Sequence, residues 1–208
     1  MFIIGITGGT GAGKTTALGA LESFSVRVLD ADAVYHELLI SNSEMKTKIG
    51  SGFSGVLIGN AVDRKKLGEI VFNDPAALLK LNSITHRYVD AEIDQRLANW
   101  EAQGETIAAI DAIALIESGR ADKCDVVVGV TAPVEMRIAR IMERDGITRR
   151  QAEVRIKAQK PAAYYREKCD HTLEDKYDTP EEFRKKCVDF FSELLRGARR
   201  ETPDGSPV

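Results

Sequence analysis

The chain has 208 residues, of which 43% are hydrophobic and 29% charged, and its formal net charge is −3. This length and balance suit a globular protein with a full core, and a slightly acidic chain is not typical of a nucleic-acid-binding protein. No apolar run reaches the roughly 20 residues that cross a bilayer, and the N-terminus has no basic signal-peptide region, so we expect a cytoplasmic protein with no nucleic-acid or membrane partner.

The first predicted elements are a buried strand at residues 2–6 and a helix at 15–24, joined by a glycine-rich turn. Residues 8–15 read G-G-T-G-A-G-K-T, which matches the phosphate-binding P-loop pattern G-x-x-x-x-G-K-[ST]. Glycines let backbone N–H groups curl around phosphate oxygens, Lys14 brings a positive charge, and the Thr15 hydroxyl can bind Mg²⁺. We therefore expect a nucleoside triphosphate here; an ordinary glycine-rich strand-to-helix turn is the alternative. The predicted nucleotide contacts in this segment are Gly9, Gly11, Ala12, Gly13, Lys14, Thr15 and Thr16.

A second strand is predicted at residues 26–30, and two carboxylates, Asp30 and Asp32, lie at its carboxyl end. Ligands of open α/β sheets bind beyond this end of the strands. An aspartate there can accept a proton from an attacking hydroxyl, which makes Asp32 a candidate general base. The alternative is that Asp32 only caps a helix that starts at Ala33.

More than seventy residues separate the second strand from the third, far more than one crossover helix needs. Asp63 is predicted to begin one helix, and Asp74-Pro75 to open a long amphipathic helix towards Trp100. The segment therefore predicts an inserted helical subdomain, with a mobile loop at the glycine-rich residues 50–59. His86 in this insert is either a contact to a substrate phosphate or a structural histidine.

The third, fourth and fifth strands are predicted at residues 106–111, 125–130 and 171–173. Strands that alternate with helices in this way indicate an α/β fold with a parallel sheet. Asp111 follows four apolar residues, so we expect its carboxylate near a bound Mg²⁺; a polar residue that merely ends the strand is the alternative. The three cysteines are widely spaced, which predicts neither a disulfide framework nor a zinc site.

Ten basic and four acidic residues lie between Arg137 and Lys168, so this stretch is a basic island in an acidic chain. A helix is predicted from Pro133 to about Gly146, and a capping box at Thr148 opens another that Pro161 closes. Arg140 and Arg144 lie one helical turn apart, so they share a face. With Arg155 they predict a lid that neutralises a transferred phosphoryl group and excludes water; solvated helix faces are the alternative.

These boundaries divide the chain into a nucleotide-binding core at 1–35, 104–135 and 170–200, an acceptor-binding insert at 36–103, a lid at 136–169 and a flexible tail at 201–208. A second capping box, at residues 179–182, opens the C-terminal helix. The chain lacks the N-K-x-D and D-x-x-G motifs, which argues against a GTPase. A long insert and an arginine-rich hairpin indicate a small-molecule kinase instead.

From residue 3 to about residue 190 the chain resembles the dephospho-CoA kinase family, which phosphorylates the ribose 3′-hydroxyl of dephospho-coenzyme A with ATP. Residues 6–16 are similar to the family's L-T-G-G-I-G-S-G-K-S-T, residues 29–32 to I-D-A-D, and residues 63–72 to D-R-x-x-L-x-x-x-V-F. Thr85-His86 resembles L-H-P, and residues 140–159 resemble the lid motifs R-x-x-x-R-D-G and R-I-x-x-Q.

The resemblance implies a P-loop parallel sheet with a helical insert and lid, and dephospho-coenzyme A as the acceptor. The implied catalytic residues are Asp32, Lys14 and Arg140. The implied ligand contacts outside the P-loop are Arg144 for the nucleotide and Asp32, Arg64, His86, Asp111 and Arg155 for the acceptor. Thr15 is the implied Mg²⁺ ligand.

The chain departs from the family pattern at three places. The family's D-x-P-L-L-F-E is D-A-I-A-L-I-E at residues 111–117, its proline after the histidine is Arg87, and its V-I-D-N ends here in Glu174-Asp175. The first two changes touch the expected acceptor pocket and the third the expected adenine pocket. Another small-molecule or nucleotide kinase therefore stays open, as does a nucleotide-responsive binding protein without turnover. The oligomeric state is not readable from the sequence.

Overall fold

The computed structural model describes residues 1–201, which form two compact units. The first unit comprises Met1–Leu29 and the chain from Thr106 onward, and the second is the continuous segment Asp30–Glu105. Of the flexible tail that the sequence predicts at 201–208, Glu201 instead ends a helix, and residues 202–208 lie outside the described residues. Within those residues, no helix is both long and apolar enough to span a bilayer.

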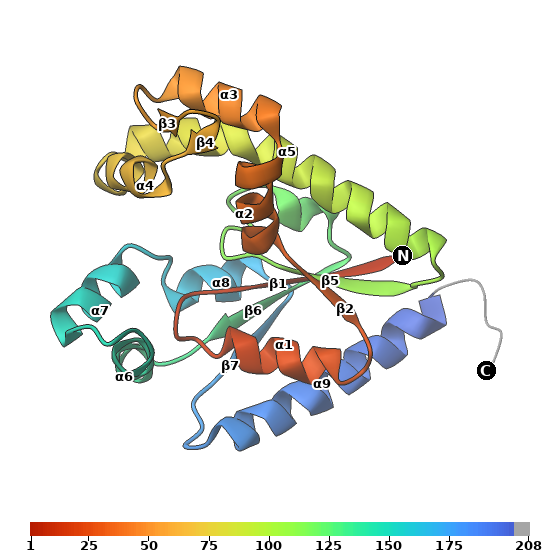
Figure 1. Cartoon of the computed structure of the whole chain (residues 1–208). Coiled ribbons are helices and arrows are strands. Elements are labelled where there is room, and N and C mark those ends of the chain that lie inside the picture. Colours follow the sequence, from red (N-terminus) through yellow and green to blue (C-terminus); the bar gives the residue numbers. More distant parts are fainter. Residues whose placement is uncertain (202–208) are drawn as a thin grey trace. The chain divides into compact units, whose positions relative to one another are not determined.

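The first unit is built on a five-stranded sheet in the order β2-β5-β1-β6-β7 (Figure 1). The central strand β1 pairs in parallel with β5 on one side and β6 on the other, and β6 pairs in parallel with β7. The predicted α/β parallel sheet is therefore confirmed. The strands are β1 (Phe2–Gly8), β2 (Arg27–Asp30), β5 (Ile107–Asp111), β6 (Val126–Thr131) and β7 (His171–Glu174).

Helices α1 (Lys14–Glu22) and α9 (Pro180–Glu201) pack together against one face of this sheet (Figure 1). Their contact side chains are apolar and fully buried, among them Leu21 of α1 and Phe183 and Phe191 of α9. The predicted capping box opens α9, because the Glu182 backbone N–H donates to the Thr179 hydroxyl and the Thr179 N–H to the Glu182 carboxylate. This core holds the turn between β1 and α1 in place.

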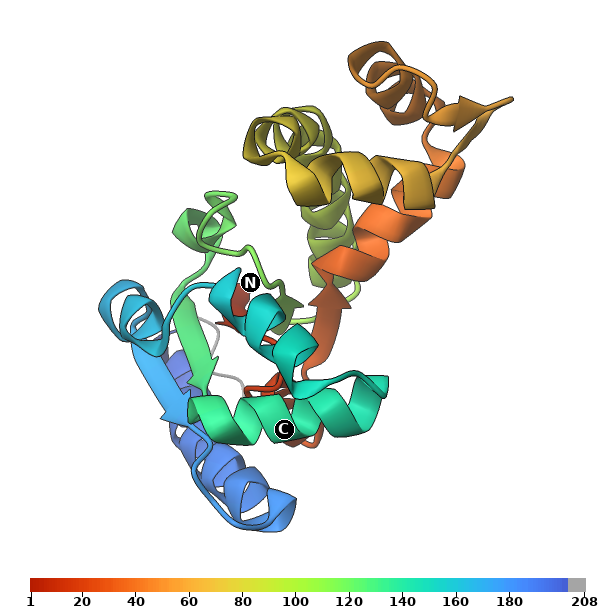
Figure 2. The ribbon, with the colours of Figure 1, turned by 90° about the vertical axis from the view of Figure 1, so that its left-hand side faces the viewer.

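Three further helices of the first unit come from the basic island: α6 (Val134–Asp145), α7 (Arg149–Lys157) and α8 (Ala162–Lys168). Helices α6 and α7 lie side by side around a small apolar cluster that includes Ile138, Ile141 and Ala152 (Figure 2). The predicted capping box at Thr148 is present. Pro161 does not itself end α7, which stops at Lys157, but precedes α8, a helix that the sequence did not predict. The 3-10 helix η1 spans Arg120–Lys123.

The second unit consists of four helices and a short hairpin. Helices α2, α3 and α4 each pack against α5, and the hairpin packs on α2 and α3. Side-chain caps start all four helices, from Asp30, Asn42, Asp63 and Asp74. The elements are α2 (Ala31–Ser41), α3 (Ser43–Gly52), β3 (Leu57–Ile58), β4 (Ala61–Val62), α4 (Arg64–Asn73) and α5 (Pro75–Ala102).

The prediction of a mobile loop at residues 50–59 is wrong. Helix α3 continues through Gly50 and Gly52, and β3 pairs with β4 in an antiparallel hairpin. A Cβ on Gly50 would collide with the Leu57 side chain, so this glycine allows the hairpin to approach the helix closely. The glycines that suggested mobility thus serve packing and the two-residue turn at Gly59-Asn60.

Candidate active site

The P-loop lies between the end of β1 and the start of α1, as the sequence predicts. Gly11 and Gly13 adopt positive φ angles of 77° and 93°, which glycine reaches without strain. No side chain caps α1 at Gly13. The N–H groups at the start of this helix are therefore available to an anion, and the helix dipole favours negative charge there.

Lys14 and Asp111, which the sequence singled out separately, form an ion pair at this end of the sheet. The parallel register sets Asp111 opposite Ile6, and the Lys14 ammonium donates to Asp111 Oδ1 over 2.5 Å. Both side chains are largely buried, at 17% and 13% exposure. The principal cation of the P-loop is thus already oriented by a carboxylate before any phosphate binds.

The oxygen ligands beside the P-loop fit a magnesium ion. Mg²⁺ in kinase sites is held by one or two protein oxygens together with substrate phosphates and water. Thr15 stands exposed in the first turn of α1, and Asp111 supplies a carboxylate next to Lys14. A dedicated cluster of three or more His, Cys, Asp or Glu side chains suited to a metal does not occur within residues 1–201.

Arg140 of α6, one of the arginines of the predicted lid, contacts the P-loop. Its Nη1 donates to the carbonyl oxygen of Gly11 over 3.3 Å, and its Nη2 lies 2.7 Å from Asp175 Oδ2. Arg140 is therefore the lid arginine that the structure brings to the P-loop. Asp175, which follows β7, was noted in the sequence only as a departure from the family pattern, and nothing indicated its partner.

A second arginine of α6, Arg137, also contacts the P-loop, although in the sequence it is recognisable only as a member of the basic island. Its Nε donates to the Thr10 carbonyl over 2.9 Å and its Nη2 to Gln159 Oε1 over 2.6 Å. Gln159 in turn accepts from the Thr10 N–H and donates to the Thr10 hydroxyl. Both hydrogen-bond partners of Arg137 are neutral, and burial lowers its pKa. We call Thr10, Arg137 and Gln159 the P-loop latch.

Arg144 and Arg155, which were expected near the phosphates, both pair with Asp145 instead. The Arg144 Nε lies 2.7 Å from Asp145 Oδ1, and Arg155 contacts Oδ2. Hydrogen bonds from the two guanidinium groups, that of Arg144 foremost, lower the pKa of Asp145 to about 2. Both arginines are substantially exposed, at 62% and 47%. Their predicted roles in ligand binding stay predictions.

In the second unit, Asp30 and Asp32 have different local roles. The carboxylate of Asp30 accepts hydrogen bonds from the N–H groups of Asp32 and Ala33, over 2.8 and 3.0 Å. Asp30 is therefore the N-cap of α2, and the alternative that Asp32 caps this helix is wrong. Asp32 lies in the first turn of α2 with an exposed side chain, which leaves its carboxylate available for chemistry.

Arg64 lies close to Tyr35 and His36, two residues of α2 that follow Asp32. Arg64 Nη2 lies 3.3 Å from His36 Nε2, and His36 stands one helical turn after Asp32 on the same face. Burial raises the pKa of Tyr35, and the positive charge of Arg64 partly opposes that shift. The second unit thus gathers a carboxylate, an imidazole and a guanidinium around the first turns of α2.

His86 and Arg87 lie in the uninterrupted helix α5. Within the described residues the imidazole of His86 makes no hydrogen bond, so the interpretation as a hydrogen-bonded structural histidine gains no support. Arg87, which replaces the family's proline, lies 3.5 Å from Glu44 and over the Tyr88 ring. A proline inside a helix removes a hydrogen bond and bends it, so Arg87 also permits α5 to continue.

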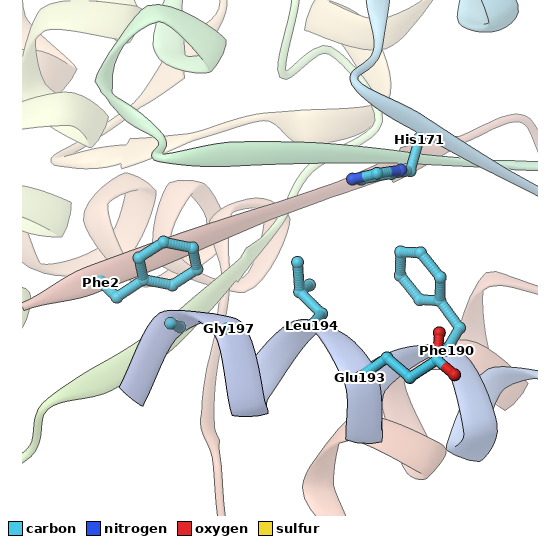
Figure 3. Close-up of a pocket in the computed structure, with 7 residues that line it drawn as sticks. Phe2, His171, Phe190, Glu193, Leu194 and Gly197 are labelled. Atoms are coloured by element: carbon cyan, nitrogen blue, oxygen red, sulfur yellow. The ribbon is translucent and has the colours of Figure 1, made fainter. Parts of the chain in front are cut away.

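A pocket of about 330 Å³ lies in the first unit but far along the strands from the P-loop. Phe2 and His171, which begin β1 and β7, face Leu194 and Phe190 of α9 across it (Figure 3). Its walls are mainly apolar, and His171 packs edge-on against Phe190. Ligands of parallel sheets bind at the carboxyl ends of strands, whereas this pocket lies at their amino ends.

The family model and the curated relatives name one family. The family model described as dephospho-CoA kinase matches residues 2–181. A dephospho-CoA kinase from Lactobacillus johnsonii is 32% identical over 94% of this chain and 99% of its own. A solved dephospho-CoA kinase from Campylobacter jejuni is 28% identical with a TM-score of 0.68, covering 94% of this chain and 98% of its own. A Thermus thermophilus crystal structure is 29% identical with a TM-score of 0.79, covering 93% and 97%.

Proposed function

This chain belongs to the dephospho-CoA kinase family, and from that premise we propose which of its residues carry out the transfer of a phosphoryl group from ATP. The proposal assigns the P-loop, Lys14 and Arg140 to the triphosphate, and Asp32 to the acceptor hydroxyl. The single observation that carries it is the Lys14–Asp111 ion pair at the carboxyl end of adjacent parallel strands.

The triphosphate is bound by the backbone N–H groups of the P-loop and by two cations. The contacts assigned to it are Gly9, Gly11, Ala12, Gly13, Lys14, Thr15 and Thr16, with Arg144 turning in from the exposed end of the lid. Lys14 exchanges Asp111 for the outer phosphates, and Arg140 extends its remaining guanidinium N–H groups towards the transferred group. Fixed cations stabilise the charge that develops on this group without reorganisation at the moment of reaction.

Magnesium is the ion that this donor set suits, with Thr15 as its protein ligand and Asp111 beside it. When bound, the ion neutralises charge on the phosphates. The residues of the chain perform the remaining work, which is to orient ATP, exclude water through the lid at 136–169, and activate the acceptor.

The acceptor is dephospho-coenzyme A, and Asp32 takes the proton of its ribose 3′-hydroxyl as that oxygen attacks the γ-phosphorus. The leaving group is ADP. The insert at 36–103 supplies Arg64 and His86 as contacts to the acceptor. Asp111 and Arg155, which lie outside the insert, are assigned to the acceptor as well. Two observations support this assignment. The carboxylate of Asp32 is exposed and does not cap α2, and the guanidinium of Arg64 contacts His36 on the same helix.

The test is a panel of acceptors offered to the purified protein with ATP and Mg²⁺, with ADP release as the readout. Dephospho-coenzyme A should turn over far faster than nucleoside monophosphates, free nucleosides or pantetheine. A nucleoside monophosphate that turned over fastest would replace this proposal with the second candidate, a nucleotide kinase on the same core. The core is assigned to 1–35, 104–135 and 170–200, and the location that we infer is the cytoplasm.

A further inference from the structure

Asp175 is the most deeply buried carboxylate beside the P-loop. The residue is 1% exposed, and its backbone N–H donates to the Thr131 carbonyl over 2.7 Å, so the end of β6 fixes its position. A Cβ on Gly13 would lie 2.7 Å from Asp175 Oδ2 and 2.9 Å from the Phe183 ring, so the carboxylate is closed in by the P-loop and α9. The position of the Asp175 carboxylate next to the P-loop is therefore fixed by its surroundings.

The charge of this buried carboxylate is compensated from one side only. Oδ2 pairs with Arg140, whereas Oδ1 accepts no hydrogen bond from any described residue. Burying an ionised carboxylate is costly unless a cation and hydrogen bonds compensate it. Arg140 thus supplies the charge that makes an ionised aspartate tolerable at this position.

The same contact decides where the Arg140 guanidinium lies. An arginine side chain on a helix surface samples many rotamers, and ordering it costs conformational entropy. Asp175 and the Gly11 carbonyl hold two of its nitrogens on the P-loop, although the side chain is 31% exposed. Arg144 and Arg155 show the contrast, because their shared partner Asp145 ends α6 and leaves both arginines substantially exposed.

We propose that Asp175 is a positioning residue for phosphoryl transfer, which holds Arg140 on the P-loop before ATP binds. The carboxylate keeps one guanidinium nitrogen and leaves the others for the phosphates, so the ordering of Arg140 is complete before the reaction. Because both partners carry a charge, the contact between Asp175 and Arg140 is a strong, charge-assisted one. This inference rests on the role of Arg140 proposed above.

The test is a double-mutant cycle of Asp175→Asn and Arg140→Ala, with kcat, the KM for ATP and the thermal midpoint as readouts. Asp175→Asn keeps the shape but removes the charge, and it should lower kcat about tenfold with a smaller change in KM. In the Arg140→Ala background the same change should leave kcat unaltered, because Asp175 acts through Arg140. Glu135→Gln removes an exposed carboxylate of α6 that pairs with Arg149 of α7, and it should leave all three readouts unaltered.

Stability provides a second readout. Arg140→Ala leaves the Asp175 carboxylate buried without its cation, so the midpoint should fall, and adding Asp175→Asn should recover part of the loss. Arg140→Lys is a second variant that we expect to fold normally. It retains a positive charge for Asp175 but lacks the planar guanidinium, so the thermal midpoint should be unchanged while kcat falls.

Two results would overturn the inference while leaving the function intact. Additive losses of kcat in the cycle would make Asp175 merely structural. An unchanged kcat with a lower KM for ATP in Asp175→Asn would mean that Asp175 competes with phosphate for Arg140. An unchanged kcat in Arg140→Ala would instead contradict the proposed role of Arg140 itself.

Discussion

The guanidinium of Arg137 occupies the space in which a side chain at position 9 would begin. A Cβ built on Gly9 collides with Arg137 Nη2 and comes within 2.8 Å of Gln159 Oε1. The second glycine of the P-loop is therefore required for more than the curl of the backbone around phosphate. The absence of a side chain at position 9 leaves room for Arg137 and Gln159 to form the hydrogen bonds of the P-loop latch with Thr10.

Gly9→Ala should therefore destabilise the protein by about 1–3 kcal/mol, the usual cost of overpacking a closed site, and should weaken ATP binding. Gly19→Ala in α1 is the matched control. No atom lies within 4 Å of a Cβ at that position, so the alanine should instead stabilise the helix by about 0.5–1 kcal/mol. Chemical denaturation and calorimetry with ATP measure both effects. Equal stabilities of the two variants would contradict the latch.

Lys14→Ala should lower kcat by about 10²-fold or more, because a preorganised charge on the phosphates is lost. It should also cost the nucleotide-free protein about 1–3 kcal/mol, since Asp111 loses its cation in a largely buried setting. Combining it with Asp111→Asn should restore part of the thermal midpoint but none of the turnover. Lys168→Ala, which breaks an exposed pair with Glu167, should change neither quantity.

Asp32→Asn should lower kcat by about 10²–10⁴-fold with little change in acceptor binding, because the amide cannot take up a proton. The helix start is unaffected, since Asp30 carries the cap. Asp30→Ala supplies the opposite pattern: about 1 kcal/mol less stability and a much smaller loss of kcat. Near-native turnover in Asp32→Asn would exclude Asp32 as the base.

The three cysteines should resist alkylation in the native protein. Burial raises the pKa of Cys124 and Cys169 to about 11 and that of Cys187 to about 12. The reactive thiolate forms only as the pH rises towards these values, so at pH 8 it is about a thousandth of the population or less. Iodoacetamide at pH 8, followed by mass spectrometry, should label these thiols in urea but hardly at all in buffer. Rapid labelling of Cys187 in buffer would contradict its burial.

The sequence predicted the sheet and most helices because their signals are local. Each helix cap that it predicted joins residues no more than four positions apart. All of these caps are present, at Asp63, Asp74, Thr148 and Thr179. The loop expected at 50–59 was wrong for a non-local reason. Gly50 is a helical residue whose missing side chain makes room for Leu57, and composition does not report that contact.

The same distinction applies to the candidate site. Lys14 and Asp111 were recognisable, because Lys14 completes the P-loop motif and Asp111 ends a buried strand, but their pairing depends on strand order. Among several arginines at helical spacing, the sequence could not separate Arg140 and Arg137, which contact the P-loop, from Arg144 and Arg155, which pair with Asp145. That separation depends on the partners across the fold, and these partners lie far away in the sequence.

The chain passes between its two units only twice, at Leu29–Asp30 and at Glu105–Thr106. The residues of the second unit to which we assign a role, Asp32, Arg64 and His86, therefore lie in one continuous stretch of the sequence. A single recombination event with two breakpoints could exchange that stretch while leaving the P-loop, Lys14 and Asp111 untouched. An exchange of this kind would replace the proposed base Asp32 together with the proposed acceptor contacts Arg64 and His86, while Asp111 and Arg155 would stay with the nucleotide site.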